Sequence, residues 1–576
     1  MKNDERKQTG ETSSSPDSSA AATIGREHPA LPARRGFLRA GLIGGAAAVA
    51  APLLPPAFSA ARASSPAPAP PSVSAFEFDE ITVADLQEGM KSGKYTARSI
   101  AEKYLARIAE VDKAGPGVNS VLETNPDALA IADALDKERK EKGPRGPLHG
   151  IPVLIKDNID TADRMMTTAG SLALLGSHPL QDSFVARKLR AAGAVILGKT
   201  NLSEWANIRS TQSSSGWSGR GGQTHNPFAL DRNPCGSSSG SGAAASANFA
   251  ALTIGSETDG SIVCPSSANG IVGIKPTVGL VSRTGIIPIS HSQDTAGPMC
   301  RTVRDAAVLL GALTGSDPED GATAASQGHA LTDYTPFLDK DGLRGARIGV
   351  VRKLFGFHEP TDKVMEAALE AMKKQGAVLV DPVELANMNF FSEGEFTVLL
   401  YELKADLNAY LARLGPRAPV KTLAEIIAFN EANREKEMPF FGQDIFLKAE
   451  AKGPLTSKEY IEALEKNHRM ARTEGIDALM DQHKLDALVA PTGGPAWLTD
   501  HVCGDHFSGG SSTAAAMAGY PIVNVPAGYV SGMPVGISFF GRAWSEPALI
   551  KVAYGFEQAT RMRRAPRFLP TADLQG

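Results

Sequence analysis

Two serine-containing glycine turns are the residues of this chain best suited to nucleophilic chemistry. The stretch 236–265 reads GSSSGSGAAASANFAALTIGSETDGSIVCP, with one Ser/Gly cluster near each end. Between the clusters, residues 241–249 are small and helix-compatible, and residues 250–254 are short and apolar. This pattern predicts a glycine turn, a helix, a strand and a second glycine turn. Such an arrangement can bring two sequence-distant serines face to face.

Lys156 is the third candidate, because it ends a short β-rich run, GIPVLI at 150–155. A serine hydroxyl is a weak nucleophile unless a base takes its proton, and a lysine serves as that base only when neutral. Burial at the end of an apolar strand lowers the lysine pKa from its reference of about 10.4. Ser237 and Ser261 of the two turns would complete the arrangement, with turn N–H groups directed at an oxyanion. The alternative is a structural salt bridge of Lys156 with Asp157 or another carboxylate, which composition alone favours.

The first Ser/Gly cluster also has other interpretations. Residues 236–240 match G-x-S-x-G, the nucleophile elbow, with Ser238 at its centre. Such an elbow needs a hydrophobic strand before it, whereas residues 226–235 contain two prolines and an Asp/Arg pair. The corresponding enzyme would be a Ser-His-Asp hydrolase using His501 or His506. A flexible Gly/Ser connection is the remaining possibility.

Strand and helix patterns alternate along the rest of the chain, as expected of an α/β fold. Residues 392–480 differ, since they are mainly helical in pattern, and we expect a helical insertion there. The expected strands are 150–155, 194–197, 346–351, 378–380, 485–490, 522–525 and 535–540, and the expected helices are 96–110, 182–192, 303–313, 361–374 and 546–561.

The composition is that of an ordinary soluble globular protein, with 42% hydrophobic and 21% charged residues. A formal net charge of −4 and the lack of an extended Lys/Arg run argue against nucleic-acid binding. The four cysteines are too few and scattered for a disulfide framework or a CxxC metal site. We expect mostly buried thiols, with one bridge possible in an oxidising compartment.

Residues 1–63 read as a leader rather than as part of the fold. A polar segment precedes RRGFLR at 34–39, which is followed by a mildly apolar run and the small-residue site Ala-Arg-Ala at 61–63. This order resembles a twin-arginine export signal and predicts a periplasmic protein. The apolar run of about 15 residues is shorter than the roughly 20 that span a bilayer, which argues against a membrane anchor. A surface basic patch is the other alternative. Residues 64–74 read as a linker and 75–576 as a single domain.

Several segments together resemble the amidase signature family over residues 76–565. They are GIPVLIKDNID, GSSSGSGAAASAN, ETDGSIVCPSSANGIVGIKPTVGLVSRTGIIPISHSQDTAGPM, YPIVNVPAG and MPVGISFFG. The resemblance implies a mixed central sheet flanked by helices on both faces. It also implies a Ser-cisSer-Lys triad, and no metal or organic cofactor. By position Ser261 corresponds to the nucleophile, Ser237 to the bridging serine after a cis peptide bond, and Lys156 to the base. The implied oxyanion donors are the backbone N–H groups of Thr258, Asp259, Gly260 and Ser261, and Ser238 would lie just outside the triad.

The sequence departs from the common family pattern at three positions. Ser239 and Asp259 stand where glycine is usual, and Val263 stands where arginine is frequent. These departures, with ISHSQDTAGPM and the segment 490–497, resemble the bacterial branch that removes the C-terminal amide of peptides. The expected substrate is therefore a peptide amide, with small aliphatic, aryl or fatty amides as alternatives. The export signal argues against a tRNA-dependent amidotransferase subunit, which works with cytoplasmic partner subunits. A non-catalytic amide- or peptide-binding protein on the same scaffold would not need the three triad positions.

Overall fold

The computed structural model describes residues 73–386, 391–416 and 418–574. All of them belong to one compact unit, Ala67–Gly576. The predicted export signal and most of the predicted linker lie outside the described residues, so both stay predictions.

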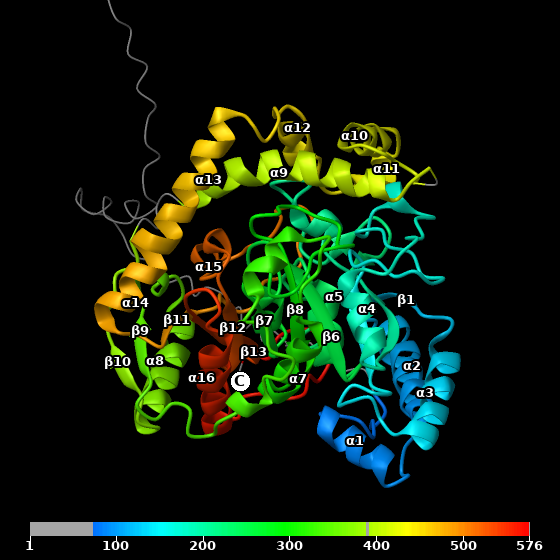
Figure 1. Cartoon of the computed structure of the whole chain (residues 1–576), viewed down its shortest axis with the longest axis horizontal. Coiled ribbons are helices and arrows are strands. Elements are labelled where there is room, and N and C mark those ends of the chain that lie inside the picture. Colours follow the sequence, from blue (N-terminus) through cyan, green and yellow to red (C-terminus); the bar gives the residue numbers. More distant parts are fainter. Residues whose placement is uncertain (1–72, 387–390, 417, 575–576) are drawn as a thin grey trace, which may run out of the picture. The chain divides into compact units, whose positions relative to one another are not determined.

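A mixed sheet of eleven strands forms the centre of this unit (Figure 1). The strand order is β1-β3-β2-β6-β8-β7-β12-β13-β11-β9-β10. β2 pairs in parallel with β3 and β6, and β9 pairs in parallel with β10 and β11, whereas the remaining pairs are antiparallel. The predicted mixed α/β architecture is confirmed. The strands are β1 Val121–Thr124, β2 Pro152–Lys156, β3 Val195–Thr200, β6 Leu252–Glu257, β7 Val272–Lys275, β8 Thr295–Cys300, β9 Arg347–Val350, β10 Val378–Val380, β11 Ala487–Pro491, β12 Ile522–Val530 and β13 Met533–Phe540, and β4 Trp217–Ser218 pairs with β5 Gly222–Gln223 outside the sheet.

Helices cover both faces of the sheet, and successive side chains of β6 point to opposite faces of it. Thr253 donates to the Ser241 carbonyl of α5, whereas Leu252 and Ile254 point to the other face, and the main hydrophobic core includes Leu252 and Ile254 as well as residues of α5. α5 also contacts α6, while α16 lies beside α7 and α8 (Figure 1). The helices of this part are α1 Val83–Lys91, α2 Ala97–Arg107, α3 Ala128–Lys142, α4 Phe184–Ala191, α5 Ser239–Ser246, α6 Val263–Ala268, α7 Val303–Leu313, α8 Glu359–Lys374, α15 Thr513–Ala518 and α16 Glu546–Thr560.

The central stretch of the sequence forms α5 and β6, with bounds that differ from the prediction. α5 begins at Ser239, and its first turn lies very close to the residues just before β1 and just after β3: a Cβ on Gly240 would come within 2.6 Å of backbone atoms of Ser120 and Asn201. β6 extends to Glu257, beyond the predicted 250–254, because it pairs with β8 up to the Glu257–Thr295 pair. The sequence patterns did not predict β8, whose Gly297 and Pro298 are unusual for a strand. The second glycine turn therefore follows the strand directly.

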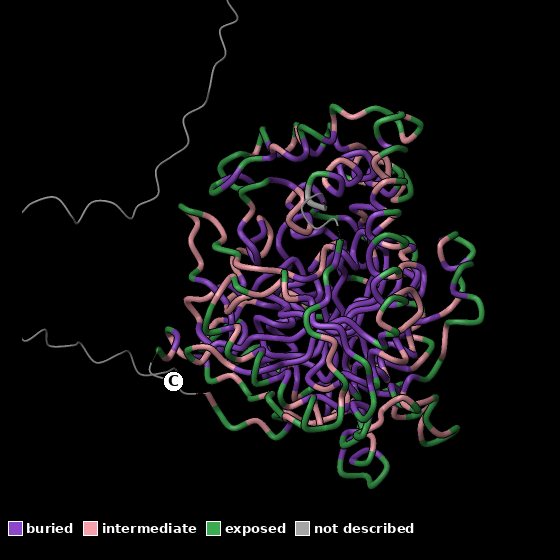
Figure 2. Tube along the Cα trace, turned by 90° about the vertical axis from the view of Figure 1, so that its left-hand side faces the viewer, coloured by how far each residue is buried: buried purple, intermediate pink, exposed green. Residues whose placement is uncertain are grey.

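The helical pattern predicted over residues 392–480 corresponds to a group of helices over 391–471 and the following α14, and Figure 1 shows the group in yellow tones beyond one edge of the α/β part. Buried residues are concentrated along the sheet in Figure 2, and these helices keep exposed outer sides. Arg209 fixes them to the rest, because its completely buried guanidinium pairs with Glu204 and also bonds to the Glu437 carbonyl. The helices are α9 Phe391–Arg413, α10 Leu423–Ala432, α11 Arg434–Glu437, α12 Asp444–Glu450 and α13 Lys458–Ala471, followed by α14 Asp477–His483.

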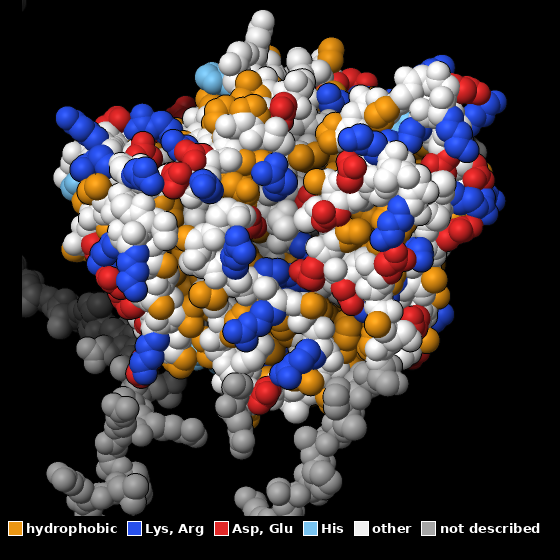
Figure 3. Space-filling model, turned by 90° about the horizontal axis from the view of Figure 1, so that it is seen from below, with side chains coloured by type: hydrophobic (Ala, Val, Ile, Leu, Met, Phe, Trp, Pro, Cys, Tyr) orange, Lys and Arg blue, Asp and Glu red, His pale blue; other side chains and the backbone are white. Residues whose placement is uncertain are grey.

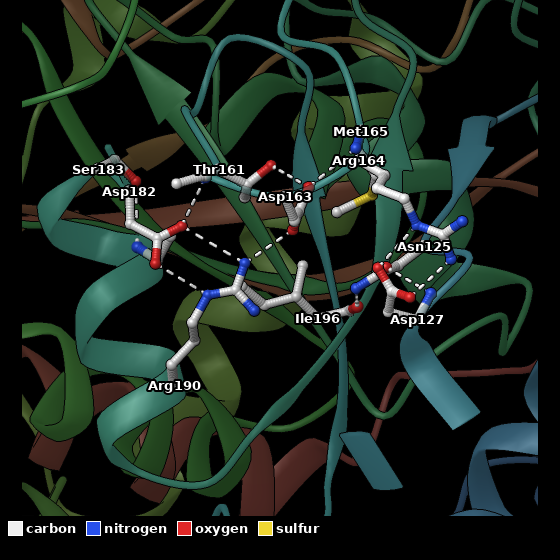
Figure 4. A network of polar contacts seen from close by, with 12 residues as sticks. Asn125, Asp127, Thr161, Asp163, Arg164, Met165, Asp182, Ser183, Arg190 and Ile196 are labelled. Atoms are coloured by element: carbon white, nitrogen blue, oxygen red, sulfur yellow. Dashed lines mark hydrogen bonds and ion pairs between the residues drawn. The ribbon is translucent and has the colours of Figure 1, made fainter. Parts of the chain in front are cut away.

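A polar network holds the irregular segment that follows β2 (Figure 4). Arg190 of α4 lies 2.7 Å from the Asp163 carboxylate and 2.9 Å from that of Asp182. Arg164 binds both carboxylate oxygens of Asp127, just before α3. Partly exposed ion pairs add little stability individually. Their geometry nevertheless fixes the path of the segment after Lys156 against α3 and α4.

The face shown in Figure 3 has Lys and Arg side chains interspersed with Asp and Glu, without a continuous surface of one sign. Within the described ranges, none of the helices combines the length and the apolar character that crossing a bilayer requires.

Candidate active site

Lys156 is the last residue of β2 and is completely buried. Its Nζ donates to Ser237 Oγ at 2.8 Å, to Ser256 Oγ at 3.0 Å and to the Ser256 carbonyl oxygen at 3.2 Å. The neighbouring Asp157 carboxylate accepts hydrogen bonds from Arg220 and Thr168 instead. Within the described part of the chain, the bonding partners of the Lys156 amine are therefore hydroxyl and carbonyl oxygens. The structural salt bridge with Asp157, which composition favoured, is not formed.

Burial lowers the pKa of Lys156 from its usual value to about 7, and the charges of Asp294 and Glu257 partly oppose this effect. Removal from water disfavours the ammonium form because no carboxylate contact replaces its hydration. A lysine with this pKa is about half neutral at neutral pH. It can therefore accept a proton, as a catalytic base must.

Ser237 lies in the first glycine turn, just before α5. The peptide bond between Gly236 and Ser237 is cis, as the family resemblance implies. Ser237 is completely buried and its hydroxyl accepts the hydrogen bond from Lys156. The next N–H group, that of Ser238, donates to the Ser261 carbonyl at 3.1 Å. This bond joins the first glycine turn to the second.

Ser238 has its hydroxyl occupied by the backbone of β6. It donates to the Ser256 carbonyl at 3.0 Å and accepts the Ser256 N–H at 3.2 Å. His501 stacks on Phe440, with ring centroids 4.0 Å apart. The hydrogen bonds of the described residues include none between Ser238 and His501 or His506. The geometry therefore does not support a Ser-His-Asp arrangement.

Ser261 ends the turn that follows β6. Gly260 in this turn has φ of +75°, a left-handed conformation that favours glycine. Ser261 is 8% exposed and lines a cavity of about 600 Å³, together with Thr258, Asp259 and Gly260. Its hydroxyl makes no hydrogen bond to another described residue. The structure thus brings all four predicted turn residues to the cavity, with the Ser261 hydroxyl unpaired.

Two buried carboxylates that the sequence analysis did not single out fix this turn. Glu257 Oε2 accepts the N–H groups of Ile262 at 2.7 Å and Val263 at 3.0 Å, at the start of α6. Asp294 accepts the Thr258 hydroxyl at 2.5 Å, and burial raises the pKa of Asp294 to about 6. An acidic residue before a helix N-terminus is a recognisable signal for Glu257. Asp294 is 36 positions from its partner, and local sequence does not reveal such a contact.

The sequence model of the amidase family matches residues 99–550. The chain belongs to the amidase signature family. It is 52% identical to a native peptide amidase of Stenotrophomonas maltophilia in a crystal structure with a TM-score of 0.82, which covers 86% of this chain and 100% of that one. A crystal structure of a peptide amidase with the competitive inhibitor chymostatin is 53% identical, with a TM-score of 0.83 and coverage of 85% and 100%. A probable amidase of Arabidopsis thaliana is 43% identical over 505 residues, covering 86% of this chain and 93% of that protein. The protein is therefore an amidohydrolase.

Two of the three departures from the family pattern line the amidase cavity. Asp259 and Val263 are both at its wall, and Trp497 from the segment 490–497 is there as well. Ser239 instead donates to the Cys235 carbonyl at 2.6 Å, inside the first turn. The branch-specific residues are thus concentrated where a substrate would bind.

A disulfide between Cys235 and Cys264 links the two glycine turns, with a Cα–Cα distance of 6.0 Å. Cys235 immediately precedes Gly236, and Cys264 is three residues beyond Ser261. Both cysteines line the amidase cavity. The sequence left one bridge possible without identifying its partners. Cys300 is a buried free thiol and Cys503 is an exposed one, so the expectation of buried thiols is wrong for Cys503.

A second cavity, of about 260 Å³, is lined by Ser237. Ser256 and Asn158 line it, as does Thr258, which also lines the larger cavity. The two residues whose hydroxyls bind Lys156 therefore line a cavity that adjoins the one lined by Ser261.

Three side chains near this second cavity form a group that could hold a cation. The ligand atoms of His291, Glu402 and Asp406 lie within 4.8 Å of one another. They are already bonded, however, with His291 Nδ1 2.8 Å from Asp406 and Glu402 accepting the Tyr460 hydroxyl at 2.7 Å. We interpret the group as a connection between the 289–294 loop and helices α9 and α13.

The Cys235–Cys264 disulfide should support both activity and stability. Reduction, or the double variant Cys235→Ser/Cys264→Ser, should lower kcat/KM at least about tenfold because the two turns lose their covalent link. The bridge closes a loop with a sequence separation of 29, so the unfolding free energy should fall by about 3 kcal/mol. Ammonia release and urea unfolding measure the two effects, and mass spectrometry confirms the redox state.

Cys503→Ser is the matched control, because this thiol is exposed and unbridged, and it should change neither quantity. A double variant with unchanged activity and unfolding midpoint would show that the bridge does not hold the site.

Proposed function

We propose that this amidase hydrolyses the C-terminal amide of peptides to the free acid and ammonia, using Ser261, Ser237 and Lys156. One observation carries the proposal: the 2.8 Å hydrogen bond from Lys156 to Ser237, made by a buried amine whose pKa is lowered to about 7. The similarity to two peptide amidase structures supports the peptide amide as substrate.

Acylation begins when Ser261 attacks the amide carbonyl carbon. Neutral Lys156 takes a proton from Ser237, which in turn takes the proton of the Ser261 hydroxyl as the new C–O bond forms. The oxyanion is stabilised by the backbone N–H groups of the turn from Thr258 to Ser261, which are arranged before the reaction begins. The cation at Lys156 lies close to Asp294 and Glu257, which favour its charged form.

Collapse of the tetrahedral intermediate breaks the C–N bond. Lys156 returns its proton through Ser237 to the leaving nitrogen, so ammonia departs and an acyl-Ser261 ester remains. Water then attacks the ester with the same relay acting in reverse, which regenerates Ser261 and releases the carboxylic acid.

The dimensions and walls of the cavity fit the acyl part of a peptide amide. About 600 Å³ lies within the range typical of small-molecule sites. Trp497, Phe507, Leu399 and Ile289 supply apolar walls, and polar backbone groups of the turn lie beside Ser261. The segment 438–441 does not belong to this wall: Met438 and Phe441 are buried elsewhere, and Phe440 is exposed.

Hydrolysis of a peptide amide by purified protein tests the proposal. Ser261→Ala and Lys156→Ala should each lower kcat/KM by at least about a thousandfold, since the groups of such a relay act as a unit. Ammonia release from peptide amides, small aliphatic amides, aryl amides and fatty amides also ranks the substrate classes.

Ser239→Ala is the matched control in the same turn, because the Ser239 hydroxyl bonds to the Cys235 carbonyl and the Ser203 hydroxyl and to none of the three triad side chains, and it should lose less than about tenfold. Undiminished turnover in both Ser261→Ala and Lys156→Ala would refute the mechanism. Faster hydrolysis of fatty or aryl amides than of peptide amides would refute the peptide amide as the substrate.

Activity should depend on pH through Lys156. Its pKa of about 7 means that acid converts the base to the inactive ammonium, so kcat/KM should fall about tenfold per unit below about pH 6 and level off above about pH 8. Asp294→Asn removes a charge that raises the pKa of Lys156, so its acidic limb should move to lower pH. A wild-type profile that is flat from about pH 5 to 8 would contradict Lys156 as the base.

We further propose that the chain is exported through its twin-arginine-type leader. The Cys235–Cys264 disulfide supports this, since disulfides persist in oxidising compartments such as the periplasm. Expression of the full chain in a bacterium with that pathway should give periplasmic protein beginning near Ser64. Arg34→Lys/Arg35→Lys should remain cytoplasmic, and an equal periplasmic yield of this variant would contradict the proposal.

A further inference from the structure

The larger cavity has an unusual distribution of ionisable groups. Three carboxyl groups line it, those of Asp259, Glu395 and Asp505, whereas none of its described lining residues is Lys, Arg or His. A bound anion would therefore meet negative charge without a basic partner. Coulomb repulsion in such a partly enclosed space is much stronger than in water.

Asp505 is already bonded to its surroundings. It accepts the Ser215 N–H at 2.9 Å and the Trp497 indole N–H at 3.2 Å. These contacts make it part of the wall.

Asp259 and Glu395 form a different arrangement, a carboxyl pair that brings α9 to the nucleophile turn. Glu395 is 8% exposed and accepts the Gln293 amide at 2.7 Å, while Asp259 accepts the Thr513 hydroxyl at 2.7 Å. Asp259 Oδ1 is buried and lacks a hydrogen-bond partner among the described residues. Asp259, two residues before Ser261 in the sequence, thus has part of its hydrogen-bonding capacity unused.

The two groups influence each other's ionisation. Burial, and then the nearby charge of Asp259, raise the pKa of Glu395 well above its usual range. Burial raises the pKa of Asp259 as well, but hydrogen bonds from Ser512 and Thr513 oppose the shift. Asp259 is therefore the group that ionises first, and a pair that shares one proton carries one negative charge.

We propose that the Asp259–Glu395 pair makes this enzyme reject a carboxylate at the reacting position, so that it binds terminal amides in preference to the corresponding acids. This rests on the proposed function, since it concerns the group attacked by Ser261. A carboxamide is neutral and can donate its N–H groups to a carboxylate, whereas a carboxylate in the same place is repelled. Specificity of this kind arises from an unfavourable contact with the wrong ligand.

The same repulsion acts on the product. Hydrolysis converts R–CO–NH₂ and water into R–COOH and ammonia, and the acid ionises to R–COO⁻ at neutral pH. The new charge appears beside Asp259, so the product dissociates readily and does not accumulate in the site. A peptide with a free C-terminal carboxylate is excluded for the same reason.

Binding to the inactive Ser261→Ala protein tests this inference directly. Calorimetry would compare an N-acetyl dipeptide amide with the matching dipeptide acid near neutral pH. We expect the amide to bind at least about tenfold more tightly than the acid. In the Ser261→Ala background, Asp259→Asn/Glu395→Gln should strengthen acid binding until the two affinities agree within about threefold, because neither charge remains.

Two control variants separate the effect of the charge of the carboxyl pair from that of the cavity's shape. Glu395→Gln alone should keep the preference, because Asp259 retains the negative charge and the glutamine amide can still donate to it. Glu393→Gln, two residues away on α9 and exposed, makes the same chemical change outside the cavity and should have no effect. Equal binding of amide and acid to Ser261→Ala would overturn the proposal. An unchanged ratio of amide to acid affinity in the folded Asp259→Asn/Glu395→Gln protein would overturn it as well.

The unmodified mature chain provides a measurement that does not depend on the folding of variants. The dipeptide acid and the uncharged dipeptide alcohol, with CH₂OH in place of the carboxylate, would be compared as inhibitors of peptide amide hydrolysis. The alcohol should inhibit at least about tenfold more strongly, and equal inhibition would contradict this inference alone. If the peptide amide is not hydrolysed at all, the proposed function fails instead.

Discussion

The structure of the site depends on one completely buried lysine that has no carboxylate against it. Lys156 is at the end of a central strand, and its amine is held by the hydroxyls of Ser237 and Ser256 and by a carbonyl. All three accept from the ammonium form, and either hydroxyl can instead donate to the lone pair of the neutral amine, but none compensates a full positive charge. The charges of Asp294 and Glu257 lie farther away, and they keep the pKa of Lys156 from falling below about 7. The neutral amine and its cation are therefore both accessible near neutral pH.

Such a base is useful only if both serines are held in fixed positions, and several independent contacts hold them. The Ser238 N–H joins the two glycine turns, Glu257 fixes the second turn at the start of α6, and the Cys235–Cys264 bridge connects the residues flanking both. α5, which consists of Ser, Gly and Ala residues, packs against β2 and β6, the strands that carry Lys156 and Glu257. The sheet thus provides rigid support for Lys156 and the two turns.

The acyl side of the site combines this sheet with the helices that extend beyond it. Glu395 and Leu399 of α9 line the same cavity as Ser261, and Trp497 and Phe507 complete its wall. Lys156 and the two serines belong to the α/β part, whereas the apolar walls of the cavity come largely from α9 and the 490–510 loops. The candidate triad and most of the apolar wall therefore lie on different elements.

The linear sequence predicted the α/β class and the helical character of residues 392–480, because hydrophobic periodicity is a local signal, and its Ser/Gly and Lys motifs singled out Lys156, Ser237 and Ser261 as candidates. It could not determine the order of the eleven strands, the strand β8, or the roles of Ser256 and Asp294, which depend on pairing between distant segments. It also left open whether Lys156 binds a carboxylate, which partner each cysteine has, and which carboxyl groups surround the substrate. Only the tertiary structure decided these points, because burial, proximity and the pKa shifts that follow from them arise when segments dozens to hundreds of residues apart pack together.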